Sequence, residues 1–205
     1  MIYSLIMNGC IVLSYLFVLH VFFQRRECDR SSLQGGFRIG ATYGVLGGAL
    51  MLFSIPVTEH VYLDLRHATI VLSAFYGGWI GGFLTAAMVS TARVLFFGWT
   101  EASLYSGAAM FLVALGCAAL SSLRTRPVVR FQAMNVSATL FVTLLLLWGL
   151  RNEGTSWSVA FCVGVTSIAA GTAMYHLITF LDRSHRNDRR LRKSEAELRS
   201  TANML

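Results

Sequence analysis

Apolar residues occur in this chain in long runs that short polar segments separate. A run of about 20 apolar residues is long enough to cross the ~30 Å hydrocarbon core of a bilayer as a helix. The pattern therefore predicts an all-α fold, a polytopic transmembrane helical bundle. The predicted spans are residues 1–23, 39–57, 104–121, 132–150 and 157–181, and a further apolar segment covers 68–97.

The segment 68–97 has an unusual length. About 30 helical residues at ~1.5 Å rise give ~45 Å, which is too long for one untilted crossing and short for two full ones. Its flanking loops also require the chain to leave and return on the same face of the membrane. The sequence G-G-W-I-G-G at its centre supplies permissive backbone for a turn. We expect a tight or re-entrant helical hairpin inside the protein, with turn residues Gly77, Gly78, Gly81 and Gly82.

Composition supports a membrane protein and limits its chemistry. The chain of 205 residues is 55% hydrophobic and 13% charged, whereas soluble domains average about 25% charged residues. We expect one transmembrane domain at 1–181 and a cytoplasmic helix at 182–205, with no room for a soluble catalytic domain. The chain itself is therefore not expected to be an enzyme.

The positive charge follows membrane topology. The net charge is +7, but the basic residues cluster in the segments 24–38 and 122–131 and in the tail after Leu181. The positive-inside rule places these segments in the cytoplasm and the linker 58–67 outside. We expect the N-terminus outside and the C-terminus in the cytoplasm, and we predict no nucleic acid partner.

Two arginines are the strongest candidate chemistry. Arg66 and Arg93 lie at equal sequence distance from the joint between Trp79 and Ile80, so a hairpin brings both guanidinium groups to one height. An arginine inside a span costs several kcal/mol, about 2.5 or more, unless it is paired or hydrated. Arginine binds carboxylates bidentately, and a helix start already favours an anion. We therefore expect a small anionic ligand.

Ion pairing within the protein is the alternative reading of the arginines. Arg66 would then pair with Asp64 or Glu59, and Arg93 with Glu101. Polar residues near the same face are candidates to complete a ligand pocket, although hydroxyl groups often serve helix packing instead. These candidates are Asp64, Ser90, Ser103, Tyr105 and Ser106.

No metal or other cofactor is predicted. Glu59, His60, Asp64 and His67 include suitable ligand types, but they form no metal-binding signature. The four cysteines show no CxxC spacing.

The tail after the last span has a heptad pattern. Leucines or serine recur every seventh position, and Leu191 and Leu198 are expected to face a partner in a weak parallel coiled coil. The pattern predicts a homodimer; a solvated basic helix beside membrane lipid is the alternative. The sequence R-K-S-E-A-E-L resembles the linker that enters a PAS domain, so we expect an effector after Leu205.

The hairpin also resembles a known family. D-L-R ending at Arg66, L-S-A-F-Y-G-G-W-I-G-G, and T-A-R ending at Arg93 are similar to the LytS-type five-transmembrane sensor domain of bacterial histidine kinases and diguanylate cyclases. Trp79 stands where the family usually has proline. The resemblance covers about residues 39–121 and implies a bacterial inner-membrane sensor in which Arg66 and Arg93 hold a pyruvate-like carboxylate.

These observations predict a sensory input domain that binds a short carboxylate from the outer side. It would signal through a C-terminal dimer helix to a diguanylate cyclase or histidine kinase effector. A transporter or channel subunit is one alternative, but it would usually show paired broken segments in two halves, and only one is visible. A membrane anchor or dimerisation module is another, and it would leave Arg93 unexplained.

Overall fold

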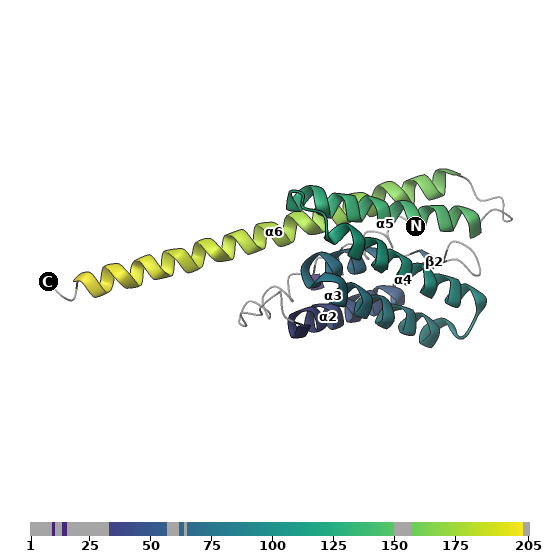
Figure 1. Ribbon diagram of the computed structural model, residues 1–205, viewed down its shortest axis with the longest axis horizontal. Coiled ribbons are helices and arrows are strands. Elements are labelled where there is room, and N and C mark those ends of the chain that lie inside the picture. Colours follow the sequence, from purple (N-terminus) through teal and green to yellow (C-terminus); the bar gives the residue numbers. More distant parts are fainter. Residues whose placement is uncertain are drawn as a thin grey trace.

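The computed structural model describes residues 10, 14–15, 33–56, 62–63, 65–149 and 157–202, for some of which it describes the backbone only. In these ranges the fold is all-helical, apart from one antiparallel ladder of two-residue strands (Figure 1). The elements are α2 (Leu33–Leu52), β1 (Ile55–Pro56), β2 (Tyr62–Leu63), α3 (Arg66–Phe97), α4 (Glu101–Ser121), α5 (Pro127–Gly149) and α6 (Trp157–Ala202).

Helix α3 lies at the centre of the fold. It packs most extensively against α2 and α4, while α5 and α6 form a neighbouring pair (Figure 1). Four helical segments in the described ranges are long and apolar enough to cross a membrane, namely Arg66–Phe97, Glu101–Ser121, Pro127–Trp148 and Ala160–Leu181. The protein is therefore a multi-pass membrane protein with the predicted helical bundle.

The predicted hairpin is present within α3. Gly78 has φ 67° and ψ −163°, and this non-helical residue divides α3 into two halves. The two halves approach closely at the next glycines: a Cβ added at Gly81 would lie 2.8 Å from the Ser73 carbonyl oxygen, and one at Gly82 would lie 3.0 Å from the Ala74 Cβ. The turn is sharper than expected, because Gly77, Gly81 and Gly82 remain helical.

Helix α2 shows how deep the hairpin reaches. A Cβ added at Gly36 would lie 2.8 Å from the Gly77 carbonyl oxygen, and one at Gly40 would lie 2.9 Å from the Gly81 carbonyl oxygen. Helix α2 therefore runs parallel to the second half of α3, and the turn lies beside the first residues of α2. We call this the Gly78 end of the bundle. The opposite end, where α3 passes into α4, is the Gly98 end.

Several boundaries differ from the prediction. Helix α2 covers Leu33–Leu52 where 39–57 was predicted, so part of the predicted loop at 24–38 is helical and Ile55–Pro56 forms β1. Helix α4 begins earlier because Thr100 caps it: Thr100 Oγ1 accepts from the Ser103 amide at 3.2 Å. Helix α5 begins at Pro127, since proline suits the first turn of a helix.

The two ends of the chain were predicted to be helical as well. Helix α6 runs without a break from Trp157 to Ala202 and extends far beyond the bundle (Figure 1). The predicted span at 1–23 lies outside the described residues, except for Cys10, Ser14 and Tyr15. The hydroxyl of Tyr15 donates to the Thr42 carbonyl oxygen at 2.8 Å, which holds this position against α2.

Candidate functional site

A buried hydrogen bond sets the register of the hairpin. Thr85 Oγ1 lies 2.8 Å from Ser73 Oγ and 2.9 Å from the Gly40 carbonyl oxygen, and both side chains are fully buried. This contact joins the two halves of α3 to each other and to α2. In the core of a membrane, these polar groups bond to each other because no water is available to replace either partner.

The register brings Arg66 and Arg93 to the same level. Each arginine lies about two helical turns from the Ser73–Thr85 contact, toward the Gly98 end. A second contact agrees: a Cβ added at Gly47 would lie 2.5 Å from Val89 Cγ2 and 3.0 Å from Thr69 Oγ1. Thr69 is about one turn from Arg66, and Val89 is about one turn from Arg93. Both arginines therefore lie about one turn from the level of Gly47, toward the Gly98 end.

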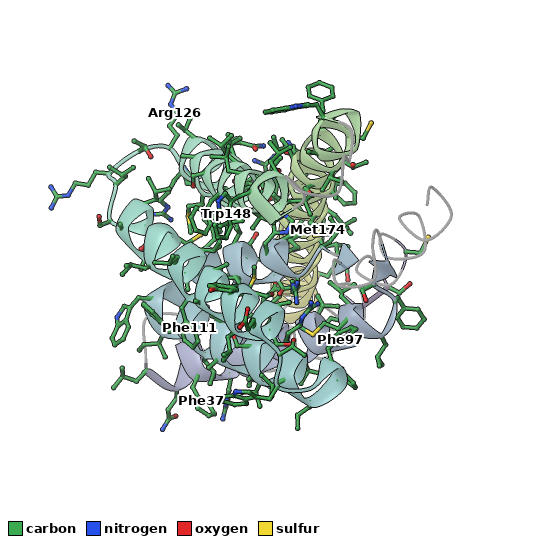
Figure 2. All side chains as sticks on the ribbon, turned by 90° about the vertical axis from the view of Figure 1, so that its right-hand side faces the viewer. Phe37, Phe97, Phe111, Arg126, Trp148 and Met174 are labelled. Atoms are coloured by element: carbon green, nitrogen blue, oxygen red, sulfur yellow. The ribbon has the colours of Figure 1, made fainter. Side chains whose placement is uncertain are left out.

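Both arginines are buried. Arg66 is 8% exposed and Arg93 is 4% exposed. The Arg66 carbonyl oxygen accepts from Thr69 Oγ1 at 2.6 Å, which holds the first turn of α3. The guanidinium carbon of Arg93 lies 4.4 Å from the centre of the Phe97 ring, a cation–π contact one turn further along the helix. Phe97 lies near the Gly98 end of the bundle, which faces the viewer in Figure 2.

Helix α4 adds Ser103 to this level. Ser90 Oγ donates to the Gly107 carbonyl oxygen at 3.4 Å, and this close approach fixes α4 against the second half of α3. One turn further along both helices, Ser103 comes to about the level of Arg93. Ser103 is 1% exposed, and its hydroxyl oxygen lies 2.9 Å from that of Thr100.

The structure describes three of the other predicted pocket residues, namely Ser90, Tyr105 and Ser106. Ser90 packs against Gly107, as the helix-packing alternative expects. Tyr105 is 65% exposed and Ser106 is half-buried, so the structure does not bring Tyr105 together with the arginines. Asp64 lies outside the described residues, as do Glu59 and His60.

Two neighbours of the arginines are not among the predicted ligand-binding residues. His67 is 2% exposed and follows Arg66 in the first turn of α3, whereas its sequence pattern suggests only a metal ligand. Phe97 contacts Arg93 through its ring. The spacing of four residues between Arg93 and Phe97 was the available signal, because such residues share one face of a helix.

The buried charged side chains described at this site are both cationic. Among the residues whose burial is described, Arg66 and Arg93 are buried, but no aspartate or glutamate is. Glu101, which the ion-pair alternative names as the partner of Arg93, is exposed at the start of α4, whereas Arg93 is buried. The described residues contain no cluster of three His, Cys, Asp or Glu side chains that would hold a metal ion. An anion is the chemical class that this arrangement suits.

The predicted dimer helix lies at the other end of the molecule. Leu191 is 62% exposed on the extended part of α6. Leu198 belongs to the same helix, but its side chain is not described.

Comparison with known proteins gives one family and one relative. The family described as 5TMR of 5TMR-LYT matches residues 21–184. The Bacillus subtilis (strain 168) protein named "Uncharacterized protein YhcK" is 34% identical over 85 residues, which is 42% of this chain and 23% of that protein. This chain therefore matches less than a quarter of the length of that relative. No solved structure matches.

Proposed function

We propose a ligand and a signalling output for this chain. The chain belongs to the family described as 5TMR of 5TMR-LYT, and this family is a membrane sensory domain of signalling proteins. The ligand is a small carboxylate such as pyruvate, bound by Arg66 and Arg93 near the Gly98 end. Ser103 is a further hydrogen-bonding group at the same level.

The carrying observation is that two buried arginines share one level of the bundle. In a low-dielectric interior, one anion between the two guanidinium groups is attracted by both positive charges. A carboxylate also matches the planar guanidinium group in geometry, because two parallel N–H···O bonds form at once. The start of α3 adds its backbone N–H groups and the positive end of the helix dipole at Arg66.

The proposed orientation places the site on the outer side of the membrane. Arg124 and Arg126 lie between α4 and α5, and Arg130 lies in the first turn of α5. This connection is at the Gly78 end, and the basic tail leaves the bundle beyond that same end (Figure 1). The positive-inside rule then assigns the Gly78 end to the cytoplasm. Reaction of a cysteine at position 62 with a membrane-impermeant thiol reagent added outside the cell checks this orientation.

The proposed output is a change in the α6 helices of a homodimer. Helix α6 connects the bundle directly to the heptad region that contains Leu191. An effector after the tail, either a diguanylate cyclase or a histidine kinase, would receive the change. A ligand shifts such an equilibrium only by its different affinities for the two states.

Calorimetry on the full chain in lipid nanodiscs tests the ligand. Arg66→Lys and Arg93→Lys should each weaken pyruvate binding by roughly ten- to a hundredfold, because lysine keeps the charge but lacks the planar fork. Arg124→Lys is the matched control, since Arg124 is exposed at the other end of the bundle. It should leave the affinity unchanged.

Two outcomes would contradict the proposal. Wild-type protein that binds neither pyruvate nor related short carboxylates would remove the ligand. Lysine variants that keep the affinity but melt at a lower temperature would instead support structural ion pairs, with Asp64 and Glu59 as the partners to examine.

A further inference from the structure

Helices α5 and α6 are joined by polar side chains. Gln132 Nε2 donates to Thr172 Oγ1 at 3.1 Å, and Asn135 Nδ2 donates to the Ile168 carbonyl oxygen at 3.2 Å. Asn135 is fully buried, and any Cβ at Gly171 would overlap its amide group. A buried amide with a defined partner fixes the register of two helices in an apolar environment. These contacts define the register of α6 on α5 in this structure.

A pair of stacked aromatic rings supports the same register. The rings of Phe131 and Tyr175 lie 4.6 Å apart at an interplanar angle of 22°. Phe131 is fully buried and Tyr175 is 5% exposed. The polar and aromatic contacts together hold α6 to α5 near the Gly78 end, just before α6 leaves the bundle.

The ring of Phe75 stands edge-on against this stack. Its centre lies 5.4 Å from that of Phe131 and 5.7 Å from that of Tyr175, at interplanar angles of 88° and 83°. The guanidinium carbon of Arg130 lies 5.1 Å from the Phe75 ring centre. Edge-to-face pairs of this kind contribute about 0.5–1.5 kcal/mol beyond their area burial and fix the relative orientation of the rings.

Phe75 belongs to the half of α3 that begins with Arg66 and ends at Gly78. In the described part of the chain, α6 packs mainly against α5 and makes a smaller contact with α3, to which Phe75 and Tyr175 contribute. A helix of this length moves as a rigid rod, so a displacement at Arg66 also displaces Phe75. Gly78 is the residue where the backbone conformation changes, so it is the natural pivot.

We propose that Phe75 is the positioning residue that couples the arginine site to α6, through its edge-on contact with the Phe131–Tyr175 stack. This inference rests on the proposed function, since it takes Arg66 and Arg93 as the input. It names the contact through which the ligand state of the α3 hairpin reaches the output helix.

Distances between spin labels test the coupling within one chain. The native cysteines are replaced, and labels are attached at Leu123→Cys and Leu191→Cys in full-length protein in nanodiscs, diluted with unlabelled protein. Both positions are exposed, one at the Gly78 end and one on the extended helix. Arg93→Gln changes the input without any ligand. We expect it to shift the mean distance between the labels by about 1–2 Å or more, as helix shifts in switching proteins do.

Phe75→Leu should abolish that shift, because leucine keeps the apolar volume but makes no edge-to-face contact. Tyr175→Leu should do the same, while Tyr175→Phe should retain the shift because it keeps the ring. Phe83→Leu is the matched control on α3: the Phe83 ring contacts that of Trp79, with centres 6.5 Å apart. This control should also retain the shift.

Either of two results would overturn the coupling role of Phe75. The shift caused by Arg93→Gln would persist in the Phe75→Leu background, or Arg93→Gln would cause no shift in the parent protein. A pyruvate arm separates this inference from the proposed function. If the parent protein binds pyruvate but the shift caused by Arg93→Gln persists in Phe75→Leu, the coupling role alone is contradicted. Absence of pyruvate binding, with the Arg93→Gln shift lost in Phe75→Leu, contradicts the ligand alone.

Discussion

The α2–α3 contact and the α5–α6 contact hold helices together by different means. Between α2 and α3, glycines let one backbone approach another, as at Gly36 and Gly40. Between α5 and α6, side chains span the gap, through Gln132 with Thr172 and through the stacked rings of Phe131 and Tyr175. The first contact leaves no room for a shift in register, because backbone atoms cannot move aside as a side chain does. The α5–α6 contact depends on side chains, which can change rotamer and form their contacts in another register.

This difference corresponds to the two proposed roles. The site needs fixed geometry, since a carboxylate fork tolerates little misalignment. The output needs a contact that has a second arrangement of similar energy. The glycine-lined contact is therefore in the place where rigidity is required, and the polar and aromatic contact is where α6 leaves the bundle.

The largest expected effect comes from filling the glycine contact. Gly40→Ala would place a Cβ 2.9 Å from the Gly81 carbonyl oxygen and 2.9 Å from the Leu84 Cβ. Overpacking of this kind costs about 1–3 kcal/mol of unfolding free energy. Gly48→Ala is the matched control on the same helix, because its Cβ would meet the Ala92 Cβ at an ordinary 3.6 Å.

Both variants gain the same helix propensity, about 0.5–1 kcal/mol, so the difference between them isolates the close approach. Thermal unfolding can be followed by the reaction of buried Cys117 with a thiol dye, after the other native cysteines are replaced. Equal stability of Gly40→Ala and Gly48→Ala would mean that α2 and α3 separate easily. The contrast between the two contacts would then disappear.

The sequence predicted the hairpin within α3 better than either contact between helices. Glycine-rich segments and two arginines at equal distance from a turn are local signals, and the hairpin and the common level of Arg66 and Arg93 follow from them. The beginning of α2 was missed because residues 34–38 are too polar and glycine-rich for an apolar run. Packing against Gly77 and Gly81 compensates for their weak helix propensity.

The meeting of Phe75, Phe131 and Tyr175 had no sequence signal. These residues come from three different helices, and their spacing along the chain carries no period. Aromatic residues are also common throughout the apolar segments of this chain, which contains 14 phenylalanines. Only the relative placement of α3, α5 and α6 selects these three rings.

A smaller effect is expected at the α5–α6 contact. Asn135→Ala removes the bond to the Ile168 carbonyl oxygen and leaves space beside Gly171. Interhelical hydrogen bonds in membranes contribute about 0.6 kcal/mol on average and rarely more than ~2. Ser137→Ala is the control, because exposed Ser137 bonds within its own helix to the Met134 carbonyl oxygen at 3.0 Å.

Asn135→Ala should also broaden the distribution of distances between labels at 123 and 191, since α6 then has more than one register on α5. Pyruvate affinity should change less than twofold, about 0.4 kcal/mol. A large loss of affinity would instead show that α5–α6 supports the arginine site directly. The separation of the two roles would then be wrong.

An effect of similar size is expected at the polar contact of Thr85 with Ser73, which joins the two halves of the hairpin. Thr85→Val keeps the shape of the side chain and removes the hydroxyl that lies 2.8 Å from Ser73 Oγ and 2.9 Å from the Gly40 carbonyl oxygen. The unfolding free energy should fall by about 0.5–1.5 kcal/mol. Thr91→Val is the control, because exposed Thr91 bonds only along its own helix, to the Ala87 carbonyl oxygen at 2.8 Å.

Glycine contacts on both sides of Thr85 should keep the two arginines level even without this hydroxyl. Pyruvate affinity of Thr85→Val is therefore expected to fall by about threefold at most, or ~0.7 kcal/mol, well below the loss caused by Arg66→Lys or Arg93→Lys. A loss as large as that of the lysine variants would show that one hydrogen bond, and not the glycine contact, sets the register of the hairpin. The rigidity assigned to the α2–α3 contact would then belong to Ser73 and Thr85.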